Sequence, residues 1–226
     1  MTPILLLHGA LGSLTQLEPL KEFLEQEGKT VYSMNFSGHS QRSFAEMFGI
    51  EQFATDVITF LEANQLDKVQ IFGYSMGGYV AVRLALNHPE KVESIVTLGT
   101  KFDWDLESAT REVAKLNPEK IEEKVPAFAR ILQQRHSPEL WKQLLERTSE
   151  MMLALGKQPL LNDDNLKEIS APVTICLGDK DDMAARRFSE QVAKILRNGK
   201  FILFENTLHP IEKVNLEILG KVILDT

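Results

Sequence analysis

The sequence predicts an α/β protein built on a mostly parallel, doubly wound sheet of about six strands with flanking helices. Short apolar segments rich in Val, Ile, Leu and Phe alternate with segments whose apolar residues recur at helical spacing. Most of these segments have the Val, Ile, Leu and Phe content that is typical of parallel strands covered on both faces. The chain of 226 residues is 43% hydrophobic and 25% charged, so we expect one globular domain over residues 1–226.

Six segments are predicted to be strands. They cover residues 4–7, 30–36, 68–73, 92–98, 173–177 and 200–204. Between them, apolar residues from Ile50 to Leu61 mark one face of a helix that ends near Asn64, and residues 80–86 mark another helix. Strands that alternate with helices are typical of βαβ units.

The alternation is interrupted once, between residues 101 and 164, where no segment has the pattern of a strand. Residues 121–134 and 139–150 have apolar residues at helical spacing instead. Ser137 and Pro138 are predicted to be the N-cap and first residue of the second of these helices. We therefore expect residues 101–164 to form an inserted helical lid over one end of the sheet.

Charge and cysteine content exclude several classes of partner and site. The net charge is −7 and the isoelectric point near 5.3, so no nucleic-acid partner is expected. The single cysteine, Cys176, excludes an intramolecular disulfide and lies in an apolar segment where we expect it to be buried. The sequence has neither the pattern of a secretory signal nor a run of about 20 apolar residues. We expect a cytoplasmic protein without a membrane partner, and no oligomeric state is predicted.

The segment Gly73-Tyr-Ser-Met-Gly-Gly78 is the strongest functional signal. It follows an apolar strand directly and precedes a helix directly, which is the context of a nucleophile elbow. The glycines are needed because the turn is tight, and the turn presents the hydroxyl of Ser75 at the edge of the sheet. The alternative is an ordinary glycine-rich turn between a strand and a helix.

A serine nucleophile needs a general base, and His209 is the best candidate among five histidines. It follows the last strand, at the end of the sheet where sites of α/β proteins lie. We expect His8 to shape the loop after the first strand, His39 to pack in a turn, His88 to cap a helix and His136 to be solvated.

The base needs an acid that orients it, and the loop after residues 173–177 offers three carboxylates. These are Asp179, Asp181 and Asp182, and the pattern of residues alone does not choose among them. The glycine-bearing loop from His8 to Ser13 is expected to direct a backbone N–H towards the same point as the N–H of Met76, as an oxyanion hole requires.

Over nearly its whole length the sequence resembles the α/β-hydrolase superfamily. The matching segments are L-L-L-H-G-A-L-G-S at 5–13, N-F-S-G-H-S at 35–40, I-F-G-Y-S-M-G-G at 71–78, P-V-T-I-C-L-G-D-K-D at 172–181 and H-P at 209–210. In two respects the chain departs from the family. It begins at what resembles the family's third strand, and residues 35–40 lack the usual aspartate and second glycine of D-x-x-G-x-G.

The resemblance implies a role for particular residues. Ser75 would be the nucleophile, His209 the base and Asp181 the acid, because the family's acid commonly lies in G-x-x-D. The backbone N–H groups of Met76 and of Ala10 or Leu11 would form the oxyanion hole.

We therefore expect a serine hydrolase that cleaves a small carboxylic ester or thioester through an acyl-enzyme, with no metal or organic cofactor. The alternatives are a lyase or C–C bond hydrolase with the same three residues, or a ligand-binding member of the fold without activity. Four lid residues are candidates to line an acyl pocket or, as the commoner alternative, to form the core of the lid: Phe128, Trp141, Met151 and Met152.

Overall fold

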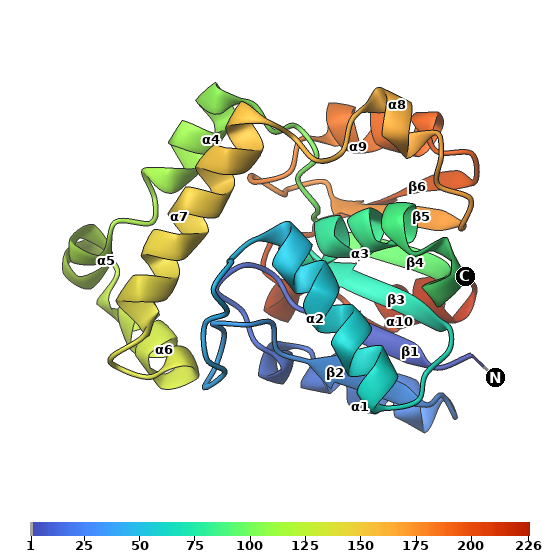
Figure 1. The fold of residues 1–226 in the computed structure, drawn as a ribbon, viewed down its shortest axis with the longest axis horizontal. Coiled ribbons are helices and arrows are strands. Elements are labelled where there is room, and N and C mark those ends of the chain that lie inside the picture. The colour runs from blue at the N-terminus through green and yellow to red at the C-terminus, as the bar shows by residue number, and fades with distance from the viewer. Residues whose placement is uncertain (1) are drawn as a thin grey trace.

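The computed structural model describes residues 2–226, and its centre is one parallel sheet of six strands. The order across the sheet is β2-β1-β3-β4-β5-β6 (Figure 1). The strands are β1 (Ile4–Leu7), β2 (Val31–Met34), β3 (Val69–Tyr74), β4 (Val92–Leu98), β5 (Val173–Gly178) and β6 (Gly199–Phe204). All six predicted strands are confirmed, and their ends differ from the predicted ends by at most two residues.

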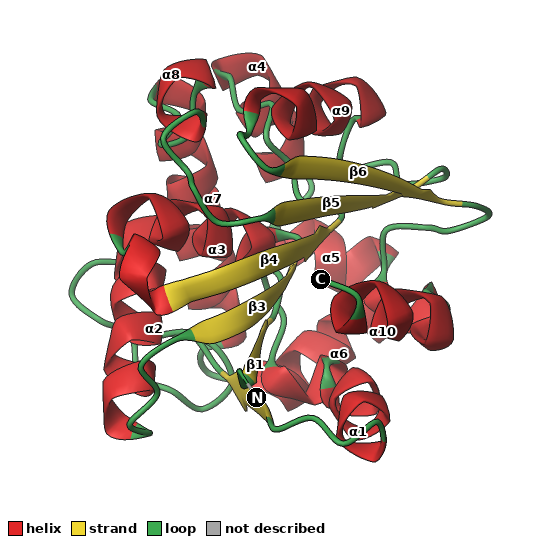
Figure 2. Ribbon diagram, turned by 90° about the vertical axis from the view of Figure 1, so that its right-hand side faces the viewer, coloured by secondary structure: helices red, strands yellow, loops and turns green. Residues whose placement is uncertain are grey.

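Helices cover both faces of the sheet, with α2 and α3 on one side and α1 and α10 on the other (Figure 2). The bounds are α1 (Glu18–Gln26), α2 (Ile50–Ala63), α3 (Met76–Asn87), α9 (Arg186–Ile195) and α10 (Leu216–Leu224). Three short 3-10 helices lie in the connections: η1 (Leu14–Gln16), η2 (Pro89–Lys91) and η3 (Ile211–Lys213). The doubly wound arrangement predicted from the apolar strands is confirmed.

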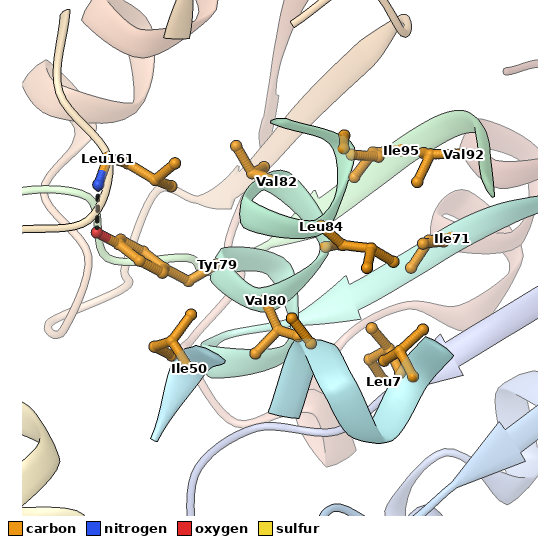
Figure 3. Packing of buried hydrophobic residues seen from close by; sticks show 14 of the residues in the cluster. Leu7, Ile50, Ile71, Tyr79, Val80, Val82, Leu84, Val92, Ile95 and Leu161 are labelled. Atoms are coloured by element: carbon orange, nitrogen blue, oxygen red, sulfur yellow. Dashed lines mark hydrogen bonds between the residues drawn. The ribbon is translucent and has the colours of Figure 1, made fainter. Parts of the chain in front are cut away.

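Alternate residues along the strands point to opposite faces of the sheet, and each face has its own hydrophobic core. Leu7, Ile71 and Ile95 lie in the core half that contains α2, α3 and α9, and Figure 3 shows them near α3. Neighbouring residues such as Phe72 and Cys176 lie in the half that contains α1 and α10. Cys176 is fully buried as predicted, and burial raises the pKa of its thiol to about 12.

Five helices are inserted between β4 and β5, and we call residues 106–166 the helical insertion. They are α4 (Leu106–Val113), α5 (Pro118–Lys124), α6 (Pro126–His136), α7 (Trp141–Lys157) and α8 (Asp163–Leu166). Figure 1 shows α4 to α7 as a layer of their own beside the sheet, on the left of the view. Among the described residues, no helix is long and apolar enough to cross a membrane.

The helices of the insertion differ from the predicted ones in two places. Residues 121–134 belong to two helices, because Pro126 has no N–H to continue α5 and instead occupies the first turn of α6. Ser137 is the C-cap of α6, with a φ of 75°, and α7 begins only at Trp141. The prediction that Ser137 and Pro138 start a helix was wrong.

Helix α4 was not predicted, because its eight residues hold few apolar side chains. Its start does carry a local signal. The carboxylate of Asp105 accepts a hydrogen bond from the N–H of Ser108 at 2.7 Å, and the Ser108 hydroxyl accepts one from the N–H of Asp105 at 3.2 Å. This reciprocal capping box satisfies N–H groups that the first turn of a helix leaves free.

The strand order places one crevice at the carboxyl end of the sheet. The chain passes from β1 to β2 at one edge and then returns to place β3 on the other side of β1. Connections on opposite sides leave a gap beyond the ends of β1 and β3, where ligands of open α/β sheets bind. Leu7 of β1 pairs with Gly73 of β3, so the loop after β1 and the turn after β3 are neighbours.

Candidate active site

Ser75 lies at the turn between β3 and α3, with a φ of 52° and a ψ of −114°. A residue with a side chain rarely adopts a positive φ, and the surroundings hold it there. The N–H of Ser75 donates to the carbonyl of Leu98 at 2.8 Å, and its own carbonyl accepts from the hydroxyl of Thr100 at 3.0 Å. The prediction of a tight turn at Ser75 between a strand and a helix is confirmed.

The glycines of this turn are required by close packing. A Cβ atom on Gly73 would clash with the backbone of Gly77 and Gly78, and one on Gly78 would clash with Thr100 Oγ1. The strand, the turn and the helix can approach this closely only without side chains at these positions. The sequence segment from Gly73 to Gly78 thus encodes the position of Ser75.

His209 and Asp181 form a buried hydrogen-bonded pair. His209 Nδ1 lies 2.7 Å from Asp181 Oδ2, and the two side chains are 8% and 1% exposed. The other oxygen of the carboxylate accepts from the N–H groups of Met183 and Ala184, both at 2.8 Å. These donors fix the carboxylate, so the imidazole donates through Nδ1 and leaves Nε2 free to accept a proton.

Gly99 lets this pair lie at the end of β4. Its φ is 63°, and a Cβ there would lie 3.0 Å from Asp181 Oδ2 and 3.1 Å from the imidazole of His209. Such contacts are tighter than ordinary packing allows, so a side chain at this position would displace the pair.

The neighbouring carboxylates have other surroundings. Asp179 is exposed, but its Oδ1 accepts from the N–H of Thr207 at 3.0 Å, in the loop that carries His209. Hydrogen bonds from Asn206 and Thr207 lower the pKa of Asp179. Asp182 is exposed. Of the three candidates, the structure brings Asp181 to His209, whereas Asp179 joins two loops.

Ser75 and His209 open onto one cavity of about 610 Å³ at the carboxyl end of the sheet. A cavity of this volume is typical of small-molecule sites. Within residues 2–226 the structure shows no hydrogen bond between the Ser75 hydroxyl and His209. Such contacts are often long before substrate binds.

The helical insertion supplies much of the apolar wall of this cavity. Phe128, Met151 and Met152, three of the four candidates from the sequence, line it. Trp141, the fourth candidate, is 1% exposed and packs inside the insertion with Leu132 and other buried residues, away from the cavity wall. The larger part of the wall was not predicted; its apolar members include Ile50, Tyr79, Trp104, Leu116, Leu155 and Met183.

Backbone N–H groups near Ser75 are available to an anion. Met76 is the first residue of α3, so its N–H has no acceptor inside the helix. Within the described chain, the N–H groups of Ala10 and Leu11 also lack a protein acceptor. Ala10, Leu11 and Met76 all line the cavity, and Leu11 has a φ of 57°.

The carbonyl of Leu11 accepts two hydrogen bonds from the end of α6. His136 Nε2 donates at 2.8 Å and Arg135 Nη1 at 3.0 Å. His136 Nδ1 accepts from the N–H of Ser40 at 2.8 Å, in the loop after β2. The prediction that His136 is solvated was wrong, because its side chain is fully buried and joins α6 to two loops of the sheet.

His136 lies in a cluster with His39 and His8. The ring centres of His8 and His39 are 4.9 Å apart, and those of His39 and His136 are 5.9 Å apart. Burial lowers the pKa of His8 to about 3 and that of His136 to about 4, and it also lowers the pKa of His39. The three imidazoles are therefore neutral at pH 7. His8 and His136 accept hydrogen bonds from other loops, whereas His39 bonds within its own turn, to the Ser37 carbonyl at 3.1 Å. His88 is the C-cap of α3, as predicted.

No group of three or more His, Cys, Asp or Glu side chains within residues 2–226 is placed to hold a metal ion. The chemistry that this arrangement offers is that of a hydroxyl, an imidazole with a carboxylate, and free N–H groups around one cavity.

Comparison with known proteins identifies the family. Residues 2–212 match the family model for the alpha/beta hydrolase fold, so the chain belongs to the α/β-hydrolase family. NosK from Streptomyces actuosus superimposes with a TM-score of 0.85 at 19% identity, over 100% of this chain and 97% of that one. The sequence resemblance and the fold predicted from it are confirmed.

Two curated relatives differ in how much they cover. Ethanol acetyltransferase 1 of Cyberlindnera jadinii is 34% identical over 97 residues, which are 42% of this chain and 29% of that protein. The "Putative carbamate hydrolase RutD" of Serratia proteamaculans is 24% identical over 99% of this chain and 90% of its own length. The present chain thus spans less than a third of the acetyltransferase.

Proposed function

We propose that the protein is a serine hydrolase that cleaves a small carboxylic ester or thioester through an acyl-enzyme on Ser75. The observation that carries this proposal is that His209, which is hydrogen-bonded to the buried Asp181, lines the same cavity as Ser75. A ligand-binding protein without activity has no need of an imidazole whose Nδ1–H is fixed by a carboxylate beside a strained serine.

In the first step, Nε2 of His209 takes the proton of the Ser75 hydroxyl while the oxygen attacks the carbonyl carbon. Asp181 holds the imidazole through Nδ1 and stabilises its cation. The imidazolium then gives its proton to the leaving alcohol or thiol, which departs as the acyl group stays on Ser75. Water, activated by the same imidazole, releases the acid.

The negative charge that forms on the carbonyl oxygen needs donors that are already in place. We assign this role to the N–H of Met76, at the positive end of α3, and to the N–H of Ala10 or Leu11. Removing one such donor lowers kcat about 100- to 1000-fold in well-studied enzymes. The two hydrogen bonds from α6 to the Leu11 carbonyl support a fixed loop here.

The apolar cavity wall supports this substrate class. The wall is largely apolar, and three flexible methionine side chains from α7 and the loop after β5 contribute to it: Met151, Met152 and Met183. Methionine adapts to irregular shapes, so the wall fits an acyl chain better than a rigid polar group. We propose that the helical insertion acts as a lid whose apolar residues select the acyl group.

The experiment is a set of p-nitrophenyl esters of increasing chain length, with wild type compared with Ser75→Ala. We expect turnover by wild type and a fall in kcat of about 10⁴- to 10⁶-fold in the variant, with the far-ultraviolet circular dichroism unchanged. A matched control is Ser149→Ala, because Ser149 lies in α7 and does not line the cavity. Equal turnover by wild type and Ser75→Ala would rule out the proposed mechanism.

A further inference from the structure

Three cationic side chains line the cavity, and they differ in what neutralises them. Lys101 Nζ lies 3.0 Å from Asp103 Oδ2, and Lys115 Nζ lies 2.8 Å from Glu112 Oε2. Arg135 has no carboxylate within 4.0 Å among the described residues. Within residues 2–226, Arg135 is thus the one cation of the cavity wall that has no ion pair.

The guanidinium of Arg135 donates only one hydrogen bond to the described residues. Nη1 donates to the Leu11 carbonyl at 3.0 Å, and within residues 2–226 the other N–H groups have no protein acceptor. Arginine carries five N–H donors in a planar fork that matches a carboxylate. Most of this donor capacity therefore remains free.

The surroundings of Arg135 make an unpaired charge unfavourable without a ligand. The side chain is half-buried, and burial lowers its pKa. The charge of Glu212, which lines the same cavity, opposes this lowering of the pKa from beyond ion-pair distance. Glu212 is exposed, and its Oε1 accepts from Gln16 Nε2 at 2.7 Å. An anionic group of a bound molecule would supply the partner that Arg135 lacks.

We propose that Arg135 forms an anion subsite beside Ser75, so that the preferred substrates are esters or thioesters that carry a carboxylate group. This inference rests on the proposed function and narrows its substrate class. Arg135 and Ser75 line one cavity, and the loop from Gly9 to Leu11 lies in the wall between α6 and the sheet. The subsite is specific for charge, whereas the methionine-rich wall is specific for shape.

Two pairs of esters test this, because the carboxylate can lie on either part of the substrate. The first pair is p-nitrophenyl hydrogen adipate and p-nitrophenyl hexanoate, which differ by a carboxylate at the end of the acyl chain. The second pair is p-acetoxybenzoate and its methyl ester, which differ by a carboxylate on the leaving group. The measurement is the ratio of kcat/KM for the anionic and the neutral ester, in which effects on the chemical step cancel.

In Arg135→Gln we expect this ratio to fall by about 10- to 100-fold for at least one pair, as the loss of a charge-assisted hydrogen bond implies. Arg135→Lys keeps the charge and should retain most of the ratio. Glu212→Gln removes an opposing charge from the wall and should raise the ratio. The matched control is Arg130→Gln, which removes the same charge from an exposed position of the same helix and should leave the ratio unchanged.

Two results would overturn the anion subsite without overturning the proposed hydrolase. Equal ratios in Arg135→Gln and Arg130→Gln for both pairs would overturn the anion subsite while leaving the hydrolase intact. A fall in the rates of both esters at a constant ratio would also overturn it, because that result assigns Arg135 only to the support of Leu11.

A binding measurement tests the subsite apart from catalysis. Titration calorimetry with adipate needs no turnover, and we expect wild type to bind adipate at least about 10-fold more tightly than Arg135→Gln does. Equal affinities would contradict the subsite. If none of the four esters were turned over but adipate bound through Arg135, the proposed function would fail and the anion subsite would stand.

Discussion

The imidazole of His136 lies 2.8 Å, through Nε2, from the carbonyl oxygen of Leu11. Its Nδ1 accepts from the N–H of Ser40 at 2.8 Å. A neutral imidazole with its proton on Nε2 makes both hydrogen bonds at once. One buried side chain of the helical insertion thus fixes the loop that we assign to the oxyanion hole.

His136→Leu removes both hydrogen bonds and leaves the cavity wall in place, because His136 does not line the cavity. We expect kcat for p-nitrophenyl esters to fall by about 10- to 100-fold with KM little changed, since the Leu11 peptide would lose its fixed position. His88→Leu, at a half-buried histidine far from the cavity, is the control. A loss confined to KM would show that His136 shapes the binding pocket only.

The same histidine makes stability depend on pH. Burial lowers the pKa of His136 from 6.5 to about 4, so between these values the unfolded chain binds a proton that the folded chain does not. The free energy of unfolding should therefore fall as pH decreases, with His136 contributing about 2 kcal/mol of that loss near pH 5. Urea unfolding near pH 7 and near pH 5 measures this.

His136→Gln supplies the comparison, because glutamine has a donor and an acceptor but no titrating group. Its loss of stability between the two pH values should be smaller than that of wild type. His8 and His39 also have lowered pKa values and remain in the variant, so some loss should persist. Identical losses in both proteins would contradict the assignment to His136.

The three aspartates after β5 should respond differently to substitution. Asp181→Asn should lower kcat about 10⁴-fold, because the amide cannot hold the imidazole in the same tautomer. Asp182→Asn should change little, since Asp182 is exposed. Asp179→Asn keeps an oxygen that can accept from the N–H of Thr207, whereas Asp179→Ala does not. Of these two Asp179 variants, we therefore expect only Asp179→Ala to slow turnover. Steady-state rates of the four variants would decide this, and an inactive Asp182→Asn would contradict it.

Enlarging a methionine of the cavity wall should change the chain length that is preferred. Met152→Trp fills part of the cavity, so kcat/KM for hexanoate esters should fall by at least about 10-fold relative to acetate esters. Met47→Trp is the matched control, because Met47 is 68% exposed and outside the cavity. The same preference in both variants would contradict an acyl pocket at this wall.

Sequence reasoning reached the sheet because its signals are local. A parallel strand such as β1 is apolar at every position, and the turn at Ser75 needs its glycines within six consecutive positions. His209 and the loop with three aspartates could be found in the same way, since each follows a strand at the carboxyl end of the sheet. The choice of Asp181 among the three came from the family resemblance alone.

The helical insertion was harder to predict, because contacts between distant segments decide its structure. Nothing near His136 in the sequence indicates that Leu11 and Ser40 will surround it, and a histidine near a helix end is ordinarily solvated. Trp141 likewise was a candidate for the cavity wall by type alone, whereas its neighbours in space place it in the core of the insertion. The N-cap at Asp105 was a local signal that could have revealed α4.

The most direct test of the central claim is the mass of the protein during turnover of a p-nitrophenyl ester. With excess p-nitrophenyl acetate quenched in acid within the first turnover, we predict a burst of about one equivalent of p-nitrophenol and one acetyl group on the peptide that contains Ser75. Ser75→Ala should show neither. Steady hydrolysis by wild type without a burst and without an acetylated Ser75 would contradict the acyl-enzyme and favour direct attack by water or a lyase with the same residues.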